Sequence, residues 1–463
     1  MRTKLPAWLE MEMQVSTICN QIEETGWLVD RELIVHHITT LDAMIVALET
    51  VIMPQVPVHC VVLEACIERD DKEEPRLYNY VKRPFLKNGQ WSASSVATWP
   101  EYTKESAPFE IVGPFTRVSF EKISLTSDKQ VKRFLLSKGW EPLEWNISKK
   151  TQKVTSPKLT EESLSSIDNN VGQLIAQHIK SHHRRNQLHG WLEKIRPDGR
   201  LPMVIDPQGA PTARATHKNI VNVPSEDKAS FFAKEMRSVF IAPSGKLLVG
   251  CDSMADQVRK LCHYMGDASF TKAVMEGKKE EGTDIHSFNM QATGLPSRGH
   301  AKNFFYGFIF GAGPTKIGKL IKRGPEEGKK IMARYFKNLP KLKLLIESLK
   351  TKNSERGYLK GLDSRPVRVR KEHELLCYLV QSAEAITMKL SLCYLSYWIK
   401  QEQLNAQIVG WIHDEYAIEV SEEQADRVAF LAEEAIRQAG RDMKLAVPSD
   451  GEAKIGKNWY EVH

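Results

Sequence analysis

The stretch that decides the fold is Gln407-Ile-Val-Gly-Trp-Ile-His-Asp-Glu-Tyr-Ala-Ile-Glu-Val420, in which two apolar runs flank His413-Asp414-Glu415. Strand-forming residues on both sides of a short polar tip predict a β-hairpin. Charge at the tip of an otherwise apolar hairpin needs either solvent or a counter-ion. Asp414 is therefore a candidate ligand of a cation.

A second buried strand is predicted at Lys246-Leu-Leu-Val-Gly-Cys-Asp252, followed by a helix from Ala255 to Met265. An isolated Asp at a strand end is more often a helix cap than a metal ligand. If this strand and the hairpin are neighbours in one sheet, Asp252 and Asp414 could jointly hold hard cations through oxygen ligands. A pair of metal ions would then activate a nucleophilic oxygen and stabilise a leaving one in a phosphoryl displacement.

A third feature is the segment from Arg298 to Phe310. Four of its side chains recur every fourth residue, so on a helix they line one slowly drifting stripe: Arg298, Lys302, Tyr306 and Phe310. Such a face suits a triphosphate and then a base, because the cations bind phosphate oxygens and an aromatic ring stacks on any base. The alternative is a solvated basic turn that runs into a buried aromatic turn.

The composition indicates a globular protein of several subdomains. The 463 residues carry a formal net charge of +7, are 41% hydrophobic and include seven scattered cysteines without a CxxC pair. These values exclude a disordered, collagenous or disulfide-stabilised miniprotein and favour a reducing compartment. The sequence has no signal peptide and no long uncharged apolar stretch, so we expect a soluble, cytoplasmic protein without a membrane partner. The basic excess suits a polyanion, although an ordinary solvated surface gives the same charge.

Two weaker motifs carry no function. Gly313-Pro-Thr-Lys-Ile-Gly-Lys319 matches a P-loop up to its last position, where Leu320 replaces Ser or Thr, and it follows a predicted helix instead of a strand. We expect a helix to stop and restart there. His59, Cys60 and Cys66 lie close enough to suggest zinc, but no second pair of suitable spacing follows.

The remaining segments predict an α+β protein. Helical periodicity predicts two helices between Ala7 and Leu48, separated by a turn at Gly26. Residues 51–117 are rich in β-branched and aromatic residues with turn signals, which predicts a strand-and-loop insertion. Helices are expected again between Ser127 and Trp191, around a basic connector at residues 148–156.

Taken in order, the Asp252 strand end, the Arg298 helix and the His413-Asp414-Glu415 tip resemble motifs A, B and C of the Pol I-like family A DNA polymerases. The likeness extends to Thr212-Ala-Arg-Ala-Thr-His217, Asn222-Val-Pro224, Asp284-Ile-His286, Gly361-Leu-Asp-Ser-Arg365, Gln381-Ser-Ala383 and Gly456-Lys-Asn-Trp459. It covers residues 127–463 well and residues 7–48 more weakly. It is strongest to the bacteriophage replicative branch, the type that recruits host thioredoxin for processivity.

The resemblance implies an α+β right-hand fold, with an antiparallel-sheet palm, helical fingers and a helical thumb that carries an insertion. The implied parts are thumb (1–50), insertion (51–120), thumb (121–200), palm with motif A (201–265), fingers with motif B (266–376) and palm with motif C (377–463). The implied activity is that of a DNA-directed DNA polymerase, which adds dNTPs to a primer 3′-hydroxyl under template direction. The implied setting is phage DNA replication in the host cytoplasm.

The resemblance also implies roles for individual residues. Asp252 and Asp414 would be catalytic and would bind two Mg²⁺ ions, or Mn²⁺ as a substitute, together with the Ser253 backbone carbonyl. The residues that would contact the dNTP are Gln257, His286, Arg298, Lys302 and Tyr306. Those that would contact the primer-template DNA are Arg214, Gln381 and His413. Phosphoryl transfer needs mainly positioning and charge neutralisation, so the chemistry argued from the residues agrees.

Three departures from the family pattern bear on these expectations. Gln257 stands where the family usually has Glu near the ribose 2′-hydroxyl; it keeps the volume but loses the charge, so we expect a strong preference for dNTPs over rNTPs that persists as a steric effect. Cys377 stands where many relatives carry an Asn that contacts the primer-template. Thumb-like sequence begins within the first ten residues, where relatives carry a 3′ to 5′ exonuclease domain. We therefore expect no proofreading in cis, and a separate exonuclease polypeptide as a candidate partner.

The insertion at residues 51–120 lies where the phage branch carries its thioredoxin-binding segment. Its aromatic side chains would suit a thioredoxin-like processivity factor, or would fill a small core of the insertion itself: Tyr78, Tyr80, Trp91, Trp99 and Tyr102. Three alternative functions stay open, namely a single-subunit RNA polymerase, a repair or translesion polymerase, and a non-enzymatic nucleic-acid-binding protein. The last would leave both carboxylates and the triphosphate face unexplained.

Overall fold

The computed structural model describes most of the chain between residues 5 and 463. The described residues are 5–56, 58–62, 67–69, 75–77, 86–98, 100–103, 105–106, 118–142, 145–148, 151, 154–159, 167, 170–224, 230–321 and 323–463. The chain divides into two compact units. The first joins Met1–Thr40 to Arg184–His463, and the second spans Leu41–His183.

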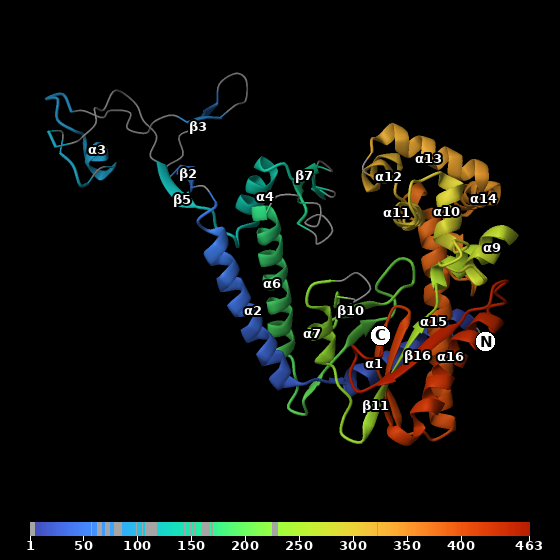
Figure 1. Ribbon diagram of the computed structural model, residues 1–463. Coiled ribbons are helices and arrows are strands. Elements are labelled where there is room, and N and C mark those ends of the chain that lie inside the picture. The colour runs from blue at the N-terminus through green and yellow to red at the C-terminus, as the bar shows by residue number, and fades with distance from the viewer. Residues whose placement is uncertain are drawn as a thin grey trace. The chain divides into compact units, whose positions relative to one another are not determined.

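Helices and strands alternate irregularly along the chain, as expected for an α+β protein (Figure 1). The helices are α1 (Ala7–Thr25), α2 (Arg31–Ile52), α3 (Ala93–Thr98), α4 (Asp128–Ser137), α6 (Asn170–Leu192), α7 (Ala233–Ser238), α8 (Asp256–Met265), α9 (Ala268–Met275), α10 (Ile285–Thr293), α11 (Arg298–Ile309), α12 (Pro314–Leu320), α13 (Pro325–Asn338), α14 (Pro340–Arg356), α15 (Leu375–Gln401) and α16 (Ala425–Asp442), with 3-10 turns η2 (Glu372–Glu374) and η3 (Glu422–Gln424). The strands are β1 (Trp27–Leu28), β2 (Val58–Val62), β3 (Ile67–Arg69), β4 (Pro75–Leu77), β5 (Val118–Lys122), β6 (Trp145–Ile147), β7 (Val154–Pro157), β8 (Arg200–Leu201), β9 (Val204–Asp206), β10 (Thr216–Lys218), β11 (Lys246–Ser253), β12 (Leu359–Lys360), β13 (Pro366–Val367), β14 (Ala406–Ile412), β15 (Glu415–Ser421) and β16 (Gly451–Gly456).

A four-stranded antiparallel sheet lies at the centre of the first unit, in the order β14-β15-β11-β16. The predicted hairpin is confirmed as β14 and β15, and the predicted Asp252 strand is β11, their direct neighbour. Helix α16 packs against β11, β15 and β16 through an apolar stripe that is fully buried (Figure 1). The condition set by the sequence, that the hairpin and the Asp252 strand share one sheet, is therefore met.

Helices α8 to α14 and the start of α15 share a second apolar core in the same unit. Its centre is aromatic: the ring of Tyr335 lies edge-on to Phe304 and Phe308, with centroids 5.1 and 5.4 Å apart. Such edge-to-face pairs stabilise a core beyond the apolar area that they bury. The P-loop-like segment is a helix restart as expected, because α12 begins at Pro314 directly after α11.

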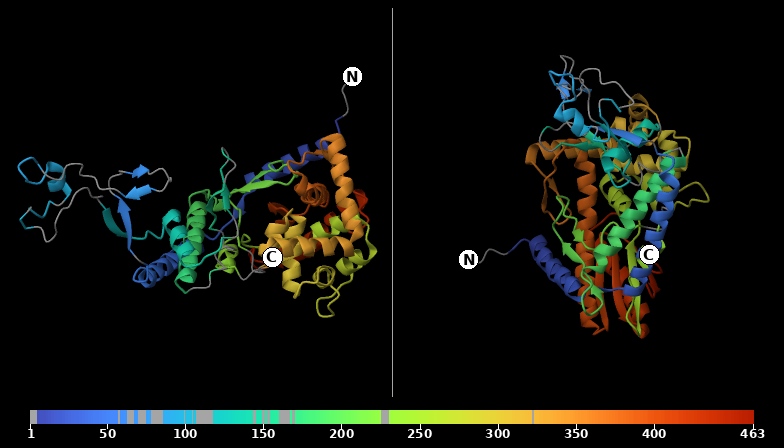
Figure 2. Two further views of the ribbon diagram at one scale, coloured as in Figure 1. Left: turned by 90° about the horizontal axis from the view of Figure 1, so that it is seen from above. Right: turned by 90° about the vertical axis from the view of Figure 1, so that its left-hand side faces the viewer.

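A buried ion cluster joins α1 to α15, which lie side by side (Figure 2). Glu12 of α1 accepts a hydrogen bond from Lys389 Nζ at 2.6 Å and another from Arg365. Arg365 also binds Asp363, with Nη2 to Oδ2 at 2.7 Å. All four side chains are at most 8% exposed, so each buried charge is compensated by an opposite one.

Helix α2 is long and apolar enough, by length and composition, to cross a membrane, and among the described residues it alone meets that test. Its buried positions recur at helical spacing, namely Ile34, Ile38, Leu41, Ile45 and Ile52. Such a stripe is typical of a helix that packs one face against other protein.

The second unit has its own apolar core, to which α4 contributes Val131, Phe134 and Leu135 and α6 contributes Ile175 and Ala176. The predicted insertion at residues 51–120 is only partly described, and Tyr78, Tyr80 and Trp99 lie outside the described residues. Of the two readings left open for these aromatic side chains, a partner surface or a core of the insertion itself, burial fits the second for Trp91, whose side chain is 8% exposed. Trp91 is thus buried, whereas Tyr102 is exposed.

Candidate active site

The tip of the β14–β15 hairpin is a two-residue turn, His413-Asp414, between the paired residues Ile412 and Glu415. His413 has φ +60°, a left-handed conformation that costs a residue other than glycine about 1–3 kcal/mol. Trp411 Nε1 donates a hydrogen bond to the His413 carbonyl at 3.0 Å and so helps to hold this turn. The sheet therefore stores backbone strain at the point where the acidic residues emerge.

Asp252 and Asp414 come together at the end of the sheet. The register of β11 and β15 places Asp252 opposite Glu415, and the Ser253 amide donates a hydrogen bond to the Asp414 carbonyl at 3.0 Å. Asp252 reaches solvent, yet the surrounding protein and then the negative charge of Asp414 raise its pKa to about 7. Burial, followed by the nearby Asp256, raises the pKa of Asp414 to about 6.

Within the described part of the chain, Asp252 and Asp414 form no salt bridge. Their neighbours are committed elsewhere: Asp256 binds Lys260 at 2.6 Å, and Glu415 accepts hydrogen bonds from Trp459. Two accessible carboxylates that repel each other fit hard divalent cations such as Mg²⁺, which prefer oxygen ligands. The residues present thus fit the metal that the sequence implies.

The predicted dNTP side chains form a second group, on α10 and α11. Asp284 caps α10 and binds the Arg298 guanidinium, with Nε at 3.1 Å and Nη2 at 2.6 Å. Burial opposes ionisation of Asp284, but the hydrogen bonds from Arg298 and Ser287 hold its pKa well below the usual range. Because the Arg298 side chain is 35% exposed, Arg298 is oriented by Asp284 while part of it still reaches solvent.

The other members of this group surround Arg298. His286 is 8% exposed, and burial together with the positive charges of Arg298 and Lys302 lowers its pKa. Lys302 is exposed and has no salt bridge among the described residues. Tyr306 lies 5.9 Å from the His286 ring and stacks on Phe310, with ring centroids 6.4 Å apart. Helix α11 therefore carries the predicted stripe, in which Arg298 and Lys302 are accessible to solvent and Tyr306 is half buried.

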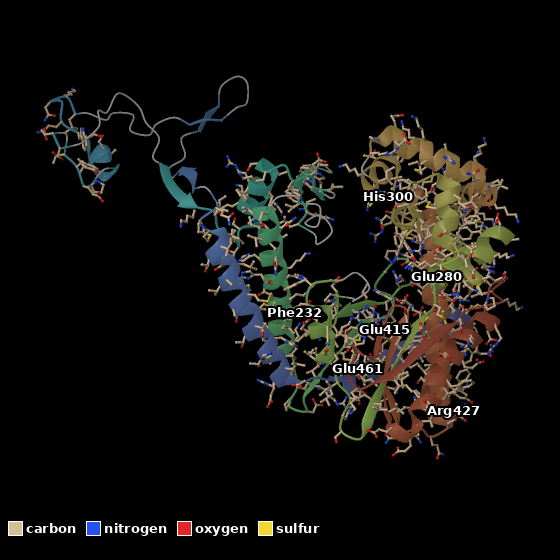
Figure 3. The ribbon with its side chains drawn as sticks, viewed as in Figure 1. Phe232, Glu280, His300, Glu415, Arg427 and Glu461 are labelled. Carbon is tan, nitrogen blue, oxygen red and sulfur yellow. The ribbon has the colours of Figure 1, made fainter. Side chains whose placement is uncertain are left out.

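The two groups come from separate elements of the first unit: His300 marks α11 and Glu415 marks the sheet in Figure 3. Hydrogen bonds and salt bridges among the described residues hold each group internally but do not connect Arg298 or Lys302 to Asp252 or Asp414. The acidic, solvent-accessible group could thus hold metal ions. The basic, aromatic group could bind the phosphates and base of a nucleotide.

The comparison with known families decides the identity of the chain. A sequence model described as "DNA polymerase family A" matches residues 114–461. The chain belongs to DNA polymerase family A. This confirms the resemblance inferred from the three motifs.

Relatives of this family A chain include phage proteins and a bacterial polymerase domain. A DNA-directed DNA polymerase of Enterobacteria phage T3 is 30% identical over 395 residues, which are 76% of this chain and 54% of the relative. A DNA-directed DNA polymerase of Escherichia phage Phieco32 is 26% identical, over 65% of this chain and 62% of the relative. The chain thus spans about half to three-fifths of the length of these phage relatives.

A solved structure shares the fold. It is described as the POL domain of Pol1 from M. smegmatis in complex with DNA primer-template and dNTP. The TM-score is 0.70 at 19% identity, and the alignment covers 97% of this chain and 70% of that one. Together with the sheet and its helices, this similarity confirms a family A polymerase fold of mixed helix and sheet.

Sequence reasoning about this family A chain missed one charged residue, Glu384 on α15. Its side chain is 1% exposed, binds Arg214 Nη2 at 3.3 Å and accepts two hydrogen bonds from Gln257 Nε2 at 3.1 and 3.3 Å. Burial raises the pKa of Glu384 to about 8, against the lowering effect of Arg214. A lone carboxylate in the apolar run Ala383-Glu-Ala-Ile predicts a buried partner, which is the one sign that could have revealed it.

The predicted DNA-contacting residues lie close to Glu384. Gln381 is three residues before it on α15 and is half buried, as is Cys377, one turn earlier. Burial raises the pKa of the Cys377 thiol to about 11, so this side chain is neutral. The His413 ring lies 5.0 Å from the His217 ring, and burial, Arg214 and His217 lower the pKa of His413 to about 4. A neutral His413 can still donate or accept a hydrogen bond.

Proposed function

We propose that this family A chain is a template-directed DNA polymerase that adds dNTPs to a primer 3′-hydroxyl. The observation that carries the proposal is the pairing of β11 with β15, which brings Asp252 and Asp414 together without a compensating cation in the described part of the chain. The T3 and Phieco32 relatives, whose names state this activity, support it. By the same analogy the protein would act in the cytoplasm of a phage-infected cell.

In this proposal Asp252, Asp414 and the Ser253 carbonyl hold two Mg²⁺ ions. The bound ions supply Lewis-acid stabilisation of the attacking and leaving oxygens. The chain itself supplies position: the strained His413-Asp414 turn fixes one carboxylate, and the β11 ladder fixes the other. Since phosphoryl transfer depends mainly on such positioning and on charge neutralisation, these residues are sufficient for the catalytic role.

Arg298, Lys302 and His286 hold the triphosphate in this proposal, and Tyr306 stacks near the incoming base and sugar. Asp284 fixes the Arg298 fork before the nucleotide arrives, which reduces the ordering cost on binding. His286 has a buried Nδ1 without a hydrogen-bond partner among the described residues. A phosphate group could be the partner of that nitrogen, either through a protonated phosphate oxygen or through a water molecule that bridges the two.

Gln257 and Glu384 together control sugar selection in this proposal. Gln257 Nε2 donates to both oxygens of the Glu384 carboxyl group, at 3.3 and 3.1 Å, which restrains the amide plane. The same carboxylate fixes Arg214, which with Gln381 and His413 contacts the primer-template. In this proposal α15 supplies, through Glu384, the carboxyl group that the family usually carries at position 257, and Glu384 acts as a positioning residue.

We propose the right-hand division as well: palm at 201–265 and 377–463, fingers at 266–376, and thumb at 1–50 and 121–200. Residues 51–120 would be the insertion that receives a thioredoxin-like processivity factor. With the processivity factor present, a variant that lacks the insertion should make shorter extension products than the full chain. The same variant should still add single nucleotides. Product lengths that do not change would reject the partner site and leave the polymerase proposal intact.

Primer extension tests the proposed activity. The full chain is incubated with a labelled primer-template, with dNTPs or rNTPs, and with Mg²⁺, Mn²⁺ or EDTA. We expect template-directed extension with dNTPs that needs the divalent ion. Extension with rNTPs at comparable kcat/KM would favour an RNA polymerase, and binding without extension would favour a non-enzymatic DNA-binding protein.

A further inference from the structure

A cluster of two histidines and one glutamate joins α2 to α6 in the second unit. Glu49 lies near the end of α2, and His178 and His182 lie four residues apart on α6. Glu49 Oε1 is 3.0 Å from His178 Nε2, and the two imidazole rings have centroids 4.5 Å apart at an interplanar angle of 61°. One nitrogen or oxygen atom from each of the three side chains lies within 4.8 Å of the others.

The spacing on α6 suits a shared ligand, because residues four apart lie one above the other on a helix face. His178 is 1% exposed, whereas the Glu49 side chain is 42% exposed, so the cluster is anchored in protein and remains open to solvent. His178 Nδ1 is buried without a hydrogen-bond partner in the described part of the chain. An ion shared with Glu49 would bind the other ring nitrogen, Nε2, which lies 3.0 Å from Glu49 Oε1, and Nδ1 would then carry the ring proton.

The donor set selects the type of ion. Two imidazoles and one carboxylate are typical ligands of zinc, whereas Mg²⁺ prefers oxygen ligands alone. With metal–ligand bonds of about 2.0–2.1 Å, tetrahedral donors lie roughly 3.4 Å apart. The Glu49–His178 pair is already closer than this, and the remaining donors need only a small side-chain rotation.

We propose that Glu49, His178 and His182 form a Zn²⁺ site that ties α2 to α6, with water in the fourth position. The site differs in chemistry from the Asp252–Asp414 pair, and it does not depend on the proposed polymerase activity. Zinc would bind the folded unit and not the unfolded chain, so it would stabilise the packing of the two helices. Without zinc, the Glu49–His178 hydrogen bond and the apolar core of the unit would hold the helices.

Metal binding is measured on the full chain in an Asp252→Asn, Asp414→Asn background, which removes the other group of carboxylates that could take up zinc. Two variants break the site at its more exposed members, His182→Asn and Glu49→Gln. Glutamine at position 49 can keep a hydrogen bond to His178 while losing the anionic ligand. His183→Asn, an exposed neighbour on the same helix, is the matched control.

We expect one Zn²⁺ per chain after dialysis, and Co²⁺ absorption bands typical of four-coordinate geometry. The affinity should fall at least about tenfold in His182→Asn and Glu49→Gln but stay unchanged in His183→Asn. Zinc should raise the Tm by several degrees in the background protein and in His183→Asn only, while the Tm values in EDTA stay alike. Zinc that does not bind, or that binds both site variants as tightly as the background, would overturn the proposal.

Discussion

Carboxylates occur in two opposite settings in this protein. Glu12 is compensated twice, by Lys389 and Arg365, and the whole cluster is withdrawn from solvent. Asp252 and Asp414 repel each other, reach solvent and have no salt bridge within the described part of the chain. The first arrangement holds α1 to α15; the second raises the free energy of the folded chain and leaves its charge for a ligand.

The difference shows how a carboxylate's partners reveal its role. A fully paired buried charge contributes to specific packing, and its loss leaves the opposite charges unpaired. Two adjacent carboxylates without a cation are strained electrostatically, and such strain is typical of functional sites. Glu384 is intermediate, because it is buried and paired with Arg214 yet also accepts hydrogen bonds from Gln257.

The largest effect on stability is expected at the compensated cluster. Glu12→Ala should lower the free energy of unfolding by about 3–5 kcal/mol, because Lys389 and Arg365 would stay buried without their anion. Urea denaturation of the variant and the parent chain measures this difference. The exposed Glu423→Gln is the control and should change stability little. A loss below about 1 kcal/mol for Glu12→Ala would show that solvent reaches the cluster.

Arg298→Ala should lower kcat/KM for dNTPs on the order of 10²-fold or more, since the variant would lose a cation proposed to bind the triphosphate. Asp284→Asn should have a smaller effect of the same kind, because Arg298 would persist but lose its fixed orientation. Steady-state single-nucleotide addition measures both variants. If Asp284→Asn proved as damaging as Arg298→Ala, the aspartate would have a direct role instead of a positioning one.

The Gln257–Glu384 pair allows a charge exchange. Glu384→Gln should reduce the preference for dNTPs over rNTPs by about tenfold, because Gln257 would lose its fixed plane. Gln257→Glu should destabilise the fold by placing a second carboxylate against Glu384. The double variant Gln257→Glu, Glu384→Gln again has one carboxyl group and one amide at this pair, with their positions exchanged. It should recover both stability and sugar preference. Effects that simply add in the double variant would contradict a coupled pair.

The smallest effect is expected for Asp252→Asn in the absence of divalent ions. Removing one of two repelling charges should leave the free energy of unfolding unchanged or raise it by at most about 1 kcal/mol. Urea denaturation at neutral pH with EDTA is the measurement. A clear loss of stability would mean that Asp252 has a compensating partner and belongs with Glu12.

Local patterns were sufficient to predict most of the sheet and the helix of the site. The hairpin, the Asp252 strand and the α11 stripe depend on residues close together in the sequence, and the structure has all three. The Glu384 contacts join residues 127 and 170 positions apart, which no local pattern encodes. The sequence left open whether Trp91 lies at the surface or is buried, because composition does not reveal which aromatic residues of an insertion are buried; the structure buries it.

The most direct test of the central claim is single-turnover primer extension by Asp414→Asn, with DNA affinity measured in parallel. The account predicts that incorporation with Mg²⁺ falls on the order of 10³-fold or more, while primer-template affinity and stability stay close to those of the parent chain. Glu423→Gln should extend primers at the parental rate. Extension by Asp414→Asn within about tenfold of the parent rate would contradict the account, because the paired carboxylates would then not carry the chemistry.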